Sequence, residues 1–317
     1  MKNFLFYFAT VFIWGSTWIG IKLQLGQIDP VVSVAYRFAL AAALLFIWCR
    51  FRKLRMRFTG NDHFFIALQG TFLFGFNYLL FYLAELQINS GLAAVIFSTI
   101  LLMNMINGFL FLRSPLDRRV IIGGILGLLG IILVFRPEIT SLSLNDESMQ
   151  GILLCIVATY LASLGNILSA RNQKHGLPVV QTNSYGMAYG AAIMLFIAIV
   201  TGKEFSIDTS FIYIGSLFYL SIFGSIIAFG CYLTLIGNIG ADRAAYATLL
   251  FPLVALGIST IWENYHWSGS ALCGVGLILL GNLLMLQRKK QTKAMDESLP
   301  EPSLETIEPG TVQPLRS

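Results

Sequence analysis

The sequence predicts an all-α integral membrane protein with ten transmembrane helices arranged as two inverted five-helix repeats. Three observations predict this fold: the composition, the length of the apolar segments, and a set of motifs that recurs along the chain. Of 317 residues, 56% are hydrophobic and only 12% are charged, and the mean hydropathy is +0.74. This amount of polar surface is too small to cover a water-soluble globule of this length. We therefore expect the protein to be embedded in a lipid bilayer.

Apolar segments of about 20 residues, the length that crosses about 30 Å of hydrocarbon, follow one another with short polar breaks between them. The first of them is interpreted as a membrane helix, because no small-x-small cleavage site follows its apolar core. The ten predicted spans are residues 4–22, 31–49, 64–84, 91–112, 120–136, 151–170, 179–201, 211–236, 244–262 and 270–287.

Lysine and arginine are distributed unevenly between the two sides of these spans. Sixteen lie at the ends and loops on the N-terminal side, whereas Lys22, Arg136 and Lys203 lie on the other side. Cytoplasmic loops carry such an excess, so both termini are expected in the cytoplasm, with the protein in a bacterial inner membrane. The bias explains the net charge of +5 without a nucleic-acid partner. Residues 288–317 change from basic to acidic and predict a disordered cytoplasmic tail.

The motifs of the first half recur in the second half at an offset close to 150 residues. Pro-Val-Val occurs at 30–32 and at 178–180, and glycines 123 and 130 are matched by glycines 274 and 281. We therefore expect one repeat in residues 1–149 and another in 150–287. Since five spans is an odd number, the second repeat enters the membrane upside down. Inverted repeats are the architecture of secondary transporters.

Motifs for other functions are missing from the sequence. The cysteines show no CxxC or Cys/His spacing, so no disulfide framework, metal site or cofactor is expected. The glycines of GSTWIGIK lack the phosphate-binding GxxxxGK[ST] spacing, so the chain is not expected to hydrolyse ATP or to be an enzyme. Two alternatives stay open: a structural or regulatory membrane protein, and an intramembrane enzyme such as a lipid-linked transferase.

Polar and aromatic side chains at membrane depth are the candidates for a substrate cavity. Trp14, Thr17 and Trp18 share one face of the first span. Tryptophan also belongs to interface belts, and buried amides can simply hold helices together, so packing is the alternative for each candidate. The candidate cavity residues are Trp14, Thr17, Trp18, Arg37, Asn77, Tyr78, Asn104, Tyr160, Asn166 and Tyr246.

Arg37 is the most informative of them, because an arginine at a helix centre costs roughly 2.5 to 3.5 kcal/mol on insertion scales. It lies roughly 9 Å inside the expected boundary. Such a charge requires carbonyls, a carboxylate such as Glu85, water, or the carboxylate of a bound substrate. Two readings stay open: an arginine that pins helices through fixed partners, and a guanidinium that binds an anionic group bidentately.

Three residues are candidates for gating or coupling. Glu85 and Glu263 fall near the outer ends of their spans, where a solvated interfacial carboxylate is the alternative for both. If either is buried, its raised pKa would suit proton coupling. Pro252 breaks the backbone ladder within its span and is a candidate bend or gate.

Three segments resemble EamA-type members of the drug/metabolite transporter superfamily: FIWGSTWIGIKL at 12–23, DPVVSVAYRFALAAALLF at 29–46, and residues 241–284. The resemblance extends over residues 4–287. It implies ten helices in two inverted repeats, a central cavity, peripheral fifth and tenth helices, and export of amino acids or related small metabolites. The chain departs from the family where TILLMN replaces a proline of the fourth helix, and where RSPL replaces the acidic residue after it, whereas Phe251-Pro252 and Glu263 keep the second-repeat version.

Overall fold

The computed structural model describes residues 2–26, 28–88, 90–140, 146–251, 253–254 and 268–286, and all regular elements in these ranges are helices. One compact unit extends from Met1 to Leu286. The predicted tail at 288–317 lies outside the described residues. The helices are α1 (Lys2–Lys22), α2 (Pro30–Phe51), α3 (Gly60–Gly70), η1 (Thr71–Phe76), α4 (Asn77–Glu85), α5 (Ser90–Ser98), α6 (Ile100–Leu112), α7 (Arg118–Val134), α8 (Arg136–Thr140), α9 (Asp146–Lys174), α10 (Val179–Val200), α11 (Phe211–Tyr219), η2 (Leu220–Ile227), α12 (Ala228–Ile239), α13 (Ala241–Ala244) and α15 (Gly269–Leu286).

The repeated Pro-Val-Val motif marks the start of a helix in both halves. Pro30 is the first residue of α2, and the Asp29 side chain accepts a hydrogen bond from the backbone N–H of Val31 at 3.0 Å. Pro178 occupies the N-cap of α10 with extended backbone angles. Proline suits both positions because the first N–H groups of a helix have no intrahelical partner.

Six helical segments in the described residues are long and apolar enough to cross a membrane. They coincide with six of the ten predicted spans. The segments are Pro30–Phe51, Gly60–Glu85, Val95–Leu112, Glu147–Lys174, Val179–Val200 and Phe211–Ile239. The predicted spans at 4–22, 120–136 and 270–287 correspond to helices α1, α7 and α15, which are 21, 17 and 18 residues long. About half of the predicted span at 244–262, residues 252 and 255–262, lies outside the described residues, so the count of ten stays a prediction.

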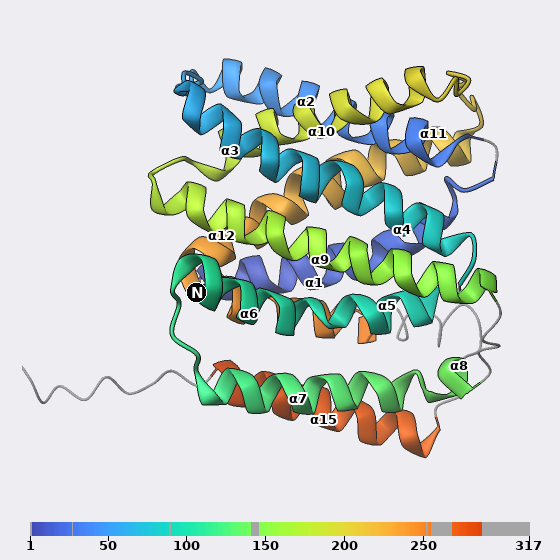
Figure 1. Cartoon of the computed structure of the whole chain (residues 1–317), viewed down its shortest axis with the longest axis vertical. Helices are drawn as coiled ribbons and strands as arrows, with labels where there is room; N and C mark the ends of the chain where they lie inside the picture. The colour runs from blue at the N-terminus through green and yellow to red at the C-terminus, as the bar shows by residue number, and fades with distance from the viewer. Residues whose placement is uncertain are drawn as a thin grey trace, which may run out of the picture. The chain divides into compact units, whose positions relative to one another are not determined.

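Helices α7 and α15 pack on each other along their length (Figure 1). A Cβ atom added at Gly123 would lie 2.7 Å from the carbonyl oxygen of Gly281, and one added at Gly130 would lie 2.6 Å from that of Gly274. Glycine is required at these positions because the two backbones touch, as small residues allow in membrane helix pairs. The pairing of 123 with 281 and of 130 with 274 also means that the two helices run in opposite directions.

The remaining helices form the centre of the unit. Helix α2 packs on α10, α9 packs on α4 and α6, and α1 packs on α12. Two of the long helices widen locally to π-helical hydrogen bonding, at η1 and at η2. Phe74-Gly75 in η1 and Phe223-Gly224 in η2 lie 149 positions apart, so the two irregular turns occur at matching places in the two halves. Such π turns are rare and occur frequently at functional sites.

Candidate functional site

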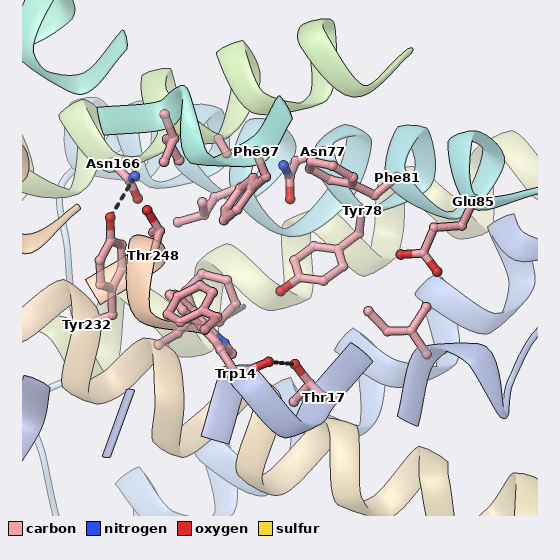
Figure 2. Close-up of a pocket in the computed structure, with 16 residues that line it drawn as sticks. Trp14, Thr17, Asn77, Tyr78, Phe81, Glu85, Phe97, Asn166, Tyr232 and Thr248 are labelled. Carbon is pink, nitrogen blue, oxygen red and sulfur yellow. Dashed lines mark hydrogen bonds between the residues drawn. The ribbon is translucent and has the colours of Figure 1, made fainter. Parts of the chain in front are cut away.

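A cavity lies among α1, α4, α9 and α12, and we call it the central cavity (Figure 2). It holds about 660 Å³ of space outside protein atoms, including its open mouth. Aromatic rings and amides dominate its lining. The lining residues are Trp14, Thr17, Ile21, Leu73, Asn77, Tyr78, Phe81, Glu85, Phe97, Ile100, Ala162, Asn166, Phe229, Tyr232, Thr248 and Phe251.

The indole of Trp14 is fixed on both its polar and its apolar sides. Its Nε1–H donates a 3.0 Å hydrogen bond to the carbonyl oxygen of Gly224 in η2. Its ring contacts the rings of Phe229, Tyr232 and Phe251, with centroids 4.8, 4.9 and 5.4 Å away. The π turn η2 therefore helps to position an aromatic wall of the cavity, which suits an apolar ligand surface.

Two amides, one from α4 and one from α9, line the central cavity. Asn77, at the start of α4, donates from Nδ2 to the backbone oxygen of Ala158 in α9 at 2.9 Å. Asn166 in α9 lies at one end of the cavity, beside Tyr232 and far from Glu85 (Figure 2). Buried amides of this kind place polar atoms against a ligand that is otherwise surrounded by rings.

Arg37 lies behind the wall of the cavity and is only 1% exposed. Its Nε donates to the Ser225 hydroxyl at 3.0 Å, and its guanidinium lies 4.6 Å from the centroid of the Tyr78 ring. The Ser221 hydroxyl donates to the Arg37 backbone oxygen at 3.0 Å. The partners foreseen for this charge were carbonyls, a carboxylate, water or substrate; the structure adds a hydroxyl and an aromatic face, the latter a cation–π contact.

One polar atom of Arg37 is still unsatisfied. Its Nη1 is buried without a hydrogen-bond partner among the described residues. A buried donor left unsatisfied costs about 1 to 3 kcal/mol, so an incoming acceptor would be stabilised there. Tyr78 separates this atom from the cavity, because its ring both lines the cavity and stacks on the guanidinium.

The structure brings six of the thirteen predicted site residues to the lining of the central cavity. These are Trp14, Thr17, Asn77, Tyr78, Asn166 and the coupling candidate Glu85. Arg37 lies directly behind Tyr78, and Asn104 accepts a hydrogen bond from Asn166.

Two predicted residues lie elsewhere. Tyr160 is 43% exposed on α9 and is not part of the lining. Tyr246 is fully buried and donates to the backbone oxygen of Val120 in α7 at 2.6 Å, which ties the second half to the first. The side chain of Trp18 and the residues Pro252 and Glu263 lie outside the described part of the structure.

Sequence reasoning missed several lining residues of the second half. Tyr232, Phe229, Thr248 and Phe251 lie in the lining but were not among the candidates. The repeat matches Tyr232 with Tyr82, but Tyr82 does not line the cavity, so this match gave no signal. The aromatic residues gave none, since phenylalanine in an apolar span is ordinary core composition and only packing shows which rings face a cavity.

The charged groups near the site lie at its ends. Glu85 lies at the end of the lining opposite Asn166 (Figure 2). Asp117, at the N-cap of α7, and Arg243, in α13, form an ion pair of 3.1 Å. Burial raises the pKa of the neighbouring Asp242 above its ordinary value, although Arg243 lowers it. Among the described residues no group of His, Cys, Asp and Glu side chains could hold a metal ion.

Comparison with known proteins identifies a family of transporters. The model of the EamA-like transporter family matches residues 1–136 and 149–287. Protein PagO of Salmonella typhimurium is 26% identical over 86% of this chain and 89% of its own length. A Salmonella typhimurium protein named "Probable amino-acid metabolite efflux pump" is 23% identical over 86% of this chain and 90% of its own.

A solved crystal structure has the same fold. It superposes with a TM-score of 0.75 at 15% identity, and the match covers 90% of this chain and 96% of that chain. The two matched segments of the family model each contribute side chains to the central cavity and together span nearly all of the described residues. The chain therefore belongs to the EamA-like transporter family of the drug/metabolite transporter superfamily.

Proposed function

We propose that this protein is a secondary transporter that exports small metabolites, amino acids among them, by alternating access through the central cavity. The location of the cavity carries the proposal. Trp14, Asn77 and Phe97 reach it from the first matched segment, and Asn166 and Tyr232 reach it from the second. A site shared by two repeats can be exposed to either side of the membrane when one repeat rocks against the other.

The proposed topology has ten spans in two inverted repeats, with both termini in the cytoplasm of a bacterial cell. Two observations support the inversion. In the repeat, glycine 123 is equivalent to 274 and glycine 130 to 281. In the structure 123 contacts 281 and 130 contacts 274, which is the reciprocal pattern that a two-fold axis in the membrane plane produces. In addition, η1 and η2 occur at matching positions.

Labelling of single cysteines from outside the cell tests this topology. A cysteine placed within residues 50–57 or in the C-terminal tail should be protected from a membrane-impermeant thiol reagent in intact cells, whereas one at Ser143 should react. Reaction of the tail from outside would contradict the inverted ten-span topology, because an odd number of spans would then separate the ends.

The lining favours a small substrate with an apolar body and one or two polar groups. Rings from five helical segments surround the space, and the amides of Asn77 and Asn166 supply hydrogen bonds. An amino acid or a related metabolite has this character, and the name of the efflux-pump relative is consistent with it. Glu85 is the candidate for proton coupling from within the lining, and Glu263 and Pro252 remain candidates for coupling and gating.

Flux into proteoliposomes, measured against a panel of amino acids and nucleobases with and without a pH gradient, tests the function. We expect saturable flux of at least one panel member by the purified protein, and none in liposomes without it. Binding of a panel member without flux would favour the structural or regulatory alternative, and chemical conversion of it would favour the enzymatic one.

A further inference from the structure

A second cavity follows the central cavity along the same helices. It holds about 1070 Å³ outside protein atoms, including its open mouth. Residues 114–116 and 240–242, which belong to the loops expected in the cytoplasm, form part of its lining, together with Lys174 at the end of α9. The full lining is Asn104, Met105, Gly108, Leu112, Ser114, Pro115, Leu116, Ala170, Gln173, Lys174, Ile236, Gly237, Asn238, Gly240, Ala241 and Asp242.

Helices α9 and α12 line both cavities in the same order. On α9, Ala162 and Asn166 face the central cavity, and Ala170 faces the second one. On α12, Tyr232 faces the central cavity and Ile236 the second. Each change takes four residues, which is about 6 Å along a helix. The two cavities are thus separated by little more than one helical turn.

Three buried polar side chains occupy that turn, and we call them the Asn104–Asn166–Tyr232 layer. Asn166 Nδ2 lies 3.4 Å from Asn104 Oδ1 and 3.3 Å from the Tyr232 hydroxyl oxygen. Figure 2 shows Asn166 and Tyr232 closing the end of the central cavity. Asn104 lines the second cavity, so the layer has one cavity on each side.

The side chains of the layer are weakly held to one another. The two hydrogen bonds that join them are longer than the usual 2.7 to 3.2 Å, and the Asn166 Oδ1 atom is buried without a hydrogen-bond partner among the described residues. Outside the layer, Asn104 Nδ2 donates to the backbone oxygen of Ala241 at 3.2 Å. Nearby, Asn107 Nδ2 donates to the Ser163 hydroxyl at 2.9 Å, a normal bond between the same two helices. Opening the layer would lose two weak hydrogen bonds and would give Asn166 Oδ1 access to water or to a substrate donor.

We propose that the second cavity is the cytoplasmic entrance of the transport path and that the Asn104–Asn166–Tyr232 layer is the barrier that opens between this entrance and the central cavity. This inference rests on the proposed function. It also predicts how easily a reagent reaches the central cavity from the cytoplasmic side, and this can be measured without a substrate. The entrance holds both Lys174 and Asp242, so it presents one charge of each sign to a zwitterion.

Thiol labelling in a cysteine-free background, with Cys49, Cys155, Cys231 and Cys273 replaced, tests the proposal. A small membrane-impermeant methanethiosulfonate reagent is applied to the cytoplasmic face of inside-out vesicles. Met105→Cys, in the second cavity, should react readily, whereas Thr248→Cys, in the central cavity, should react slowly. Adding Asn166→Ala should raise the rate at Thr248→Cys about tenfold, because both bonds of the layer are lost.

Asn107→Ala is the matched control, since it removes an amide from the same helix interface outside the layer. It should leave the rate at Thr248→Cys unchanged. Tyr232→Phe removes only the hydroxyl and should raise the rate by a smaller factor, and it serves as the test if Asn166→Ala does not fold. An unchanged rate in the layer variant, an equal rise in the control, or reaction of Met105→Cys only from the opposite face would overturn the proposal. If labelling responds as expected while no panel member is transported, only the proposed function fails.

Discussion

The α7–α15 pair and the central cavity are both built by one matched segment meeting the other, but the contacts differ in kind. In the pair, Gly130 and Gly274 bring two backbones into direct contact. Around the cavity, rings such as Trp14 and Phe229 touch at their edges and leave space, and the Asn166 Oδ1 atom has no hydrogen-bond partner in the described part of the chain. The first interface is suited to stay closed and the second to change, because close-packed surfaces resist rearrangement.

Gly274→Val should have the largest effect on stability, because the ideal position of its Cβ is 2.5 Å from the Gly130 carbonyl oxygen. Overpacking of this kind costs about 3 kcal/mol in the free energy of unfolding. Thermal unfolding of the purified protein measures it. Gly276→Val is the control, since nothing lies within 4 Å of a Cβ added there on the same helix. Equal losses in the two variants would mean that backbone contact does not hold the pair together.

Arg37→Ala should come next, because it removes the hydrogen bond to Ser225 and leaves a void beside Tyr78. We expect a loss of about 2 kcal/mol in the free energy of unfolding, and of transport with it. Arg37→Lys keeps the charge but not the planar fork, so it should fold and transport about tenfold more slowly. Wild-type flux from Arg37→Lys would show that a bare positive charge suffices, and failure of this variant to fold would make the arginine a structural pin.

Trp14→Phe should have a smaller effect. It keeps an aromatic ring but removes the hydrogen bond to Gly224, which is worth about 1 kcal/mol. We expect flux to fall about fivefold with little change in thermal unfolding. Trp48→Phe is the matched control, because Trp48 is 52% exposed and does not line the cavity. A similar fall in both variants would count against a special role for the cavity tryptophan.

Glu85→Gln and Glu263→Gln should give the smallest effects, confined to the response to a pH gradient. Glutamine keeps the shape of each side chain and cannot carry a proton, so a coupled carboxylate would lose the stimulation of flux by the gradient. Glu85, which lines the cavity, is expected to show this loss. Unchanged gradient dependence in both variants, measured in the same proteoliposomes, would remove these carboxylates from the mechanism.

Much of the fold could be predicted because bilayer thickness and the repeat leave marks in the sequence. The apolar segments coincide with helices over the six long spans, and the repeated glycines 123, 130, 274 and 281 meet in one interface. The π turns could not be predicted, since TFLFGF and LSIFGSII have ordinary helical composition. They arise where tertiary contacts, such as that of Gly224 with Trp14, compete with the regular ladder.

The site could be predicted only in part. Buried polar residues such as Asn77 and Asn166 stand out in an apolar span because their burial requires partners. Phe229, Phe251 and Thr248 do not stand out, because rings and hydroxyls are common in membrane helices. Tyr160 was predicted to line the cavity but does not. It lies on the same helix as Asn166, on the exposed side, and composition alone did not separate the two faces of that helix.

The central claim is that substrate passes through the cavity between the two matched segments. Thiol labelling of Thr17→Cys in the cysteine-free protein, combined with flux in proteoliposomes, tests this most directly, because Thr17 lines the cavity. A transported substrate should slow labelling of Thr17→Cys, and complete labelling should stop flux, whereas Phe12→Cys, on the side of the same helix that is exposed to lipid, should not label and should keep its flux after the same treatment. Undiminished flux after complete labelling of Thr17→Cys would contradict passage through this cavity.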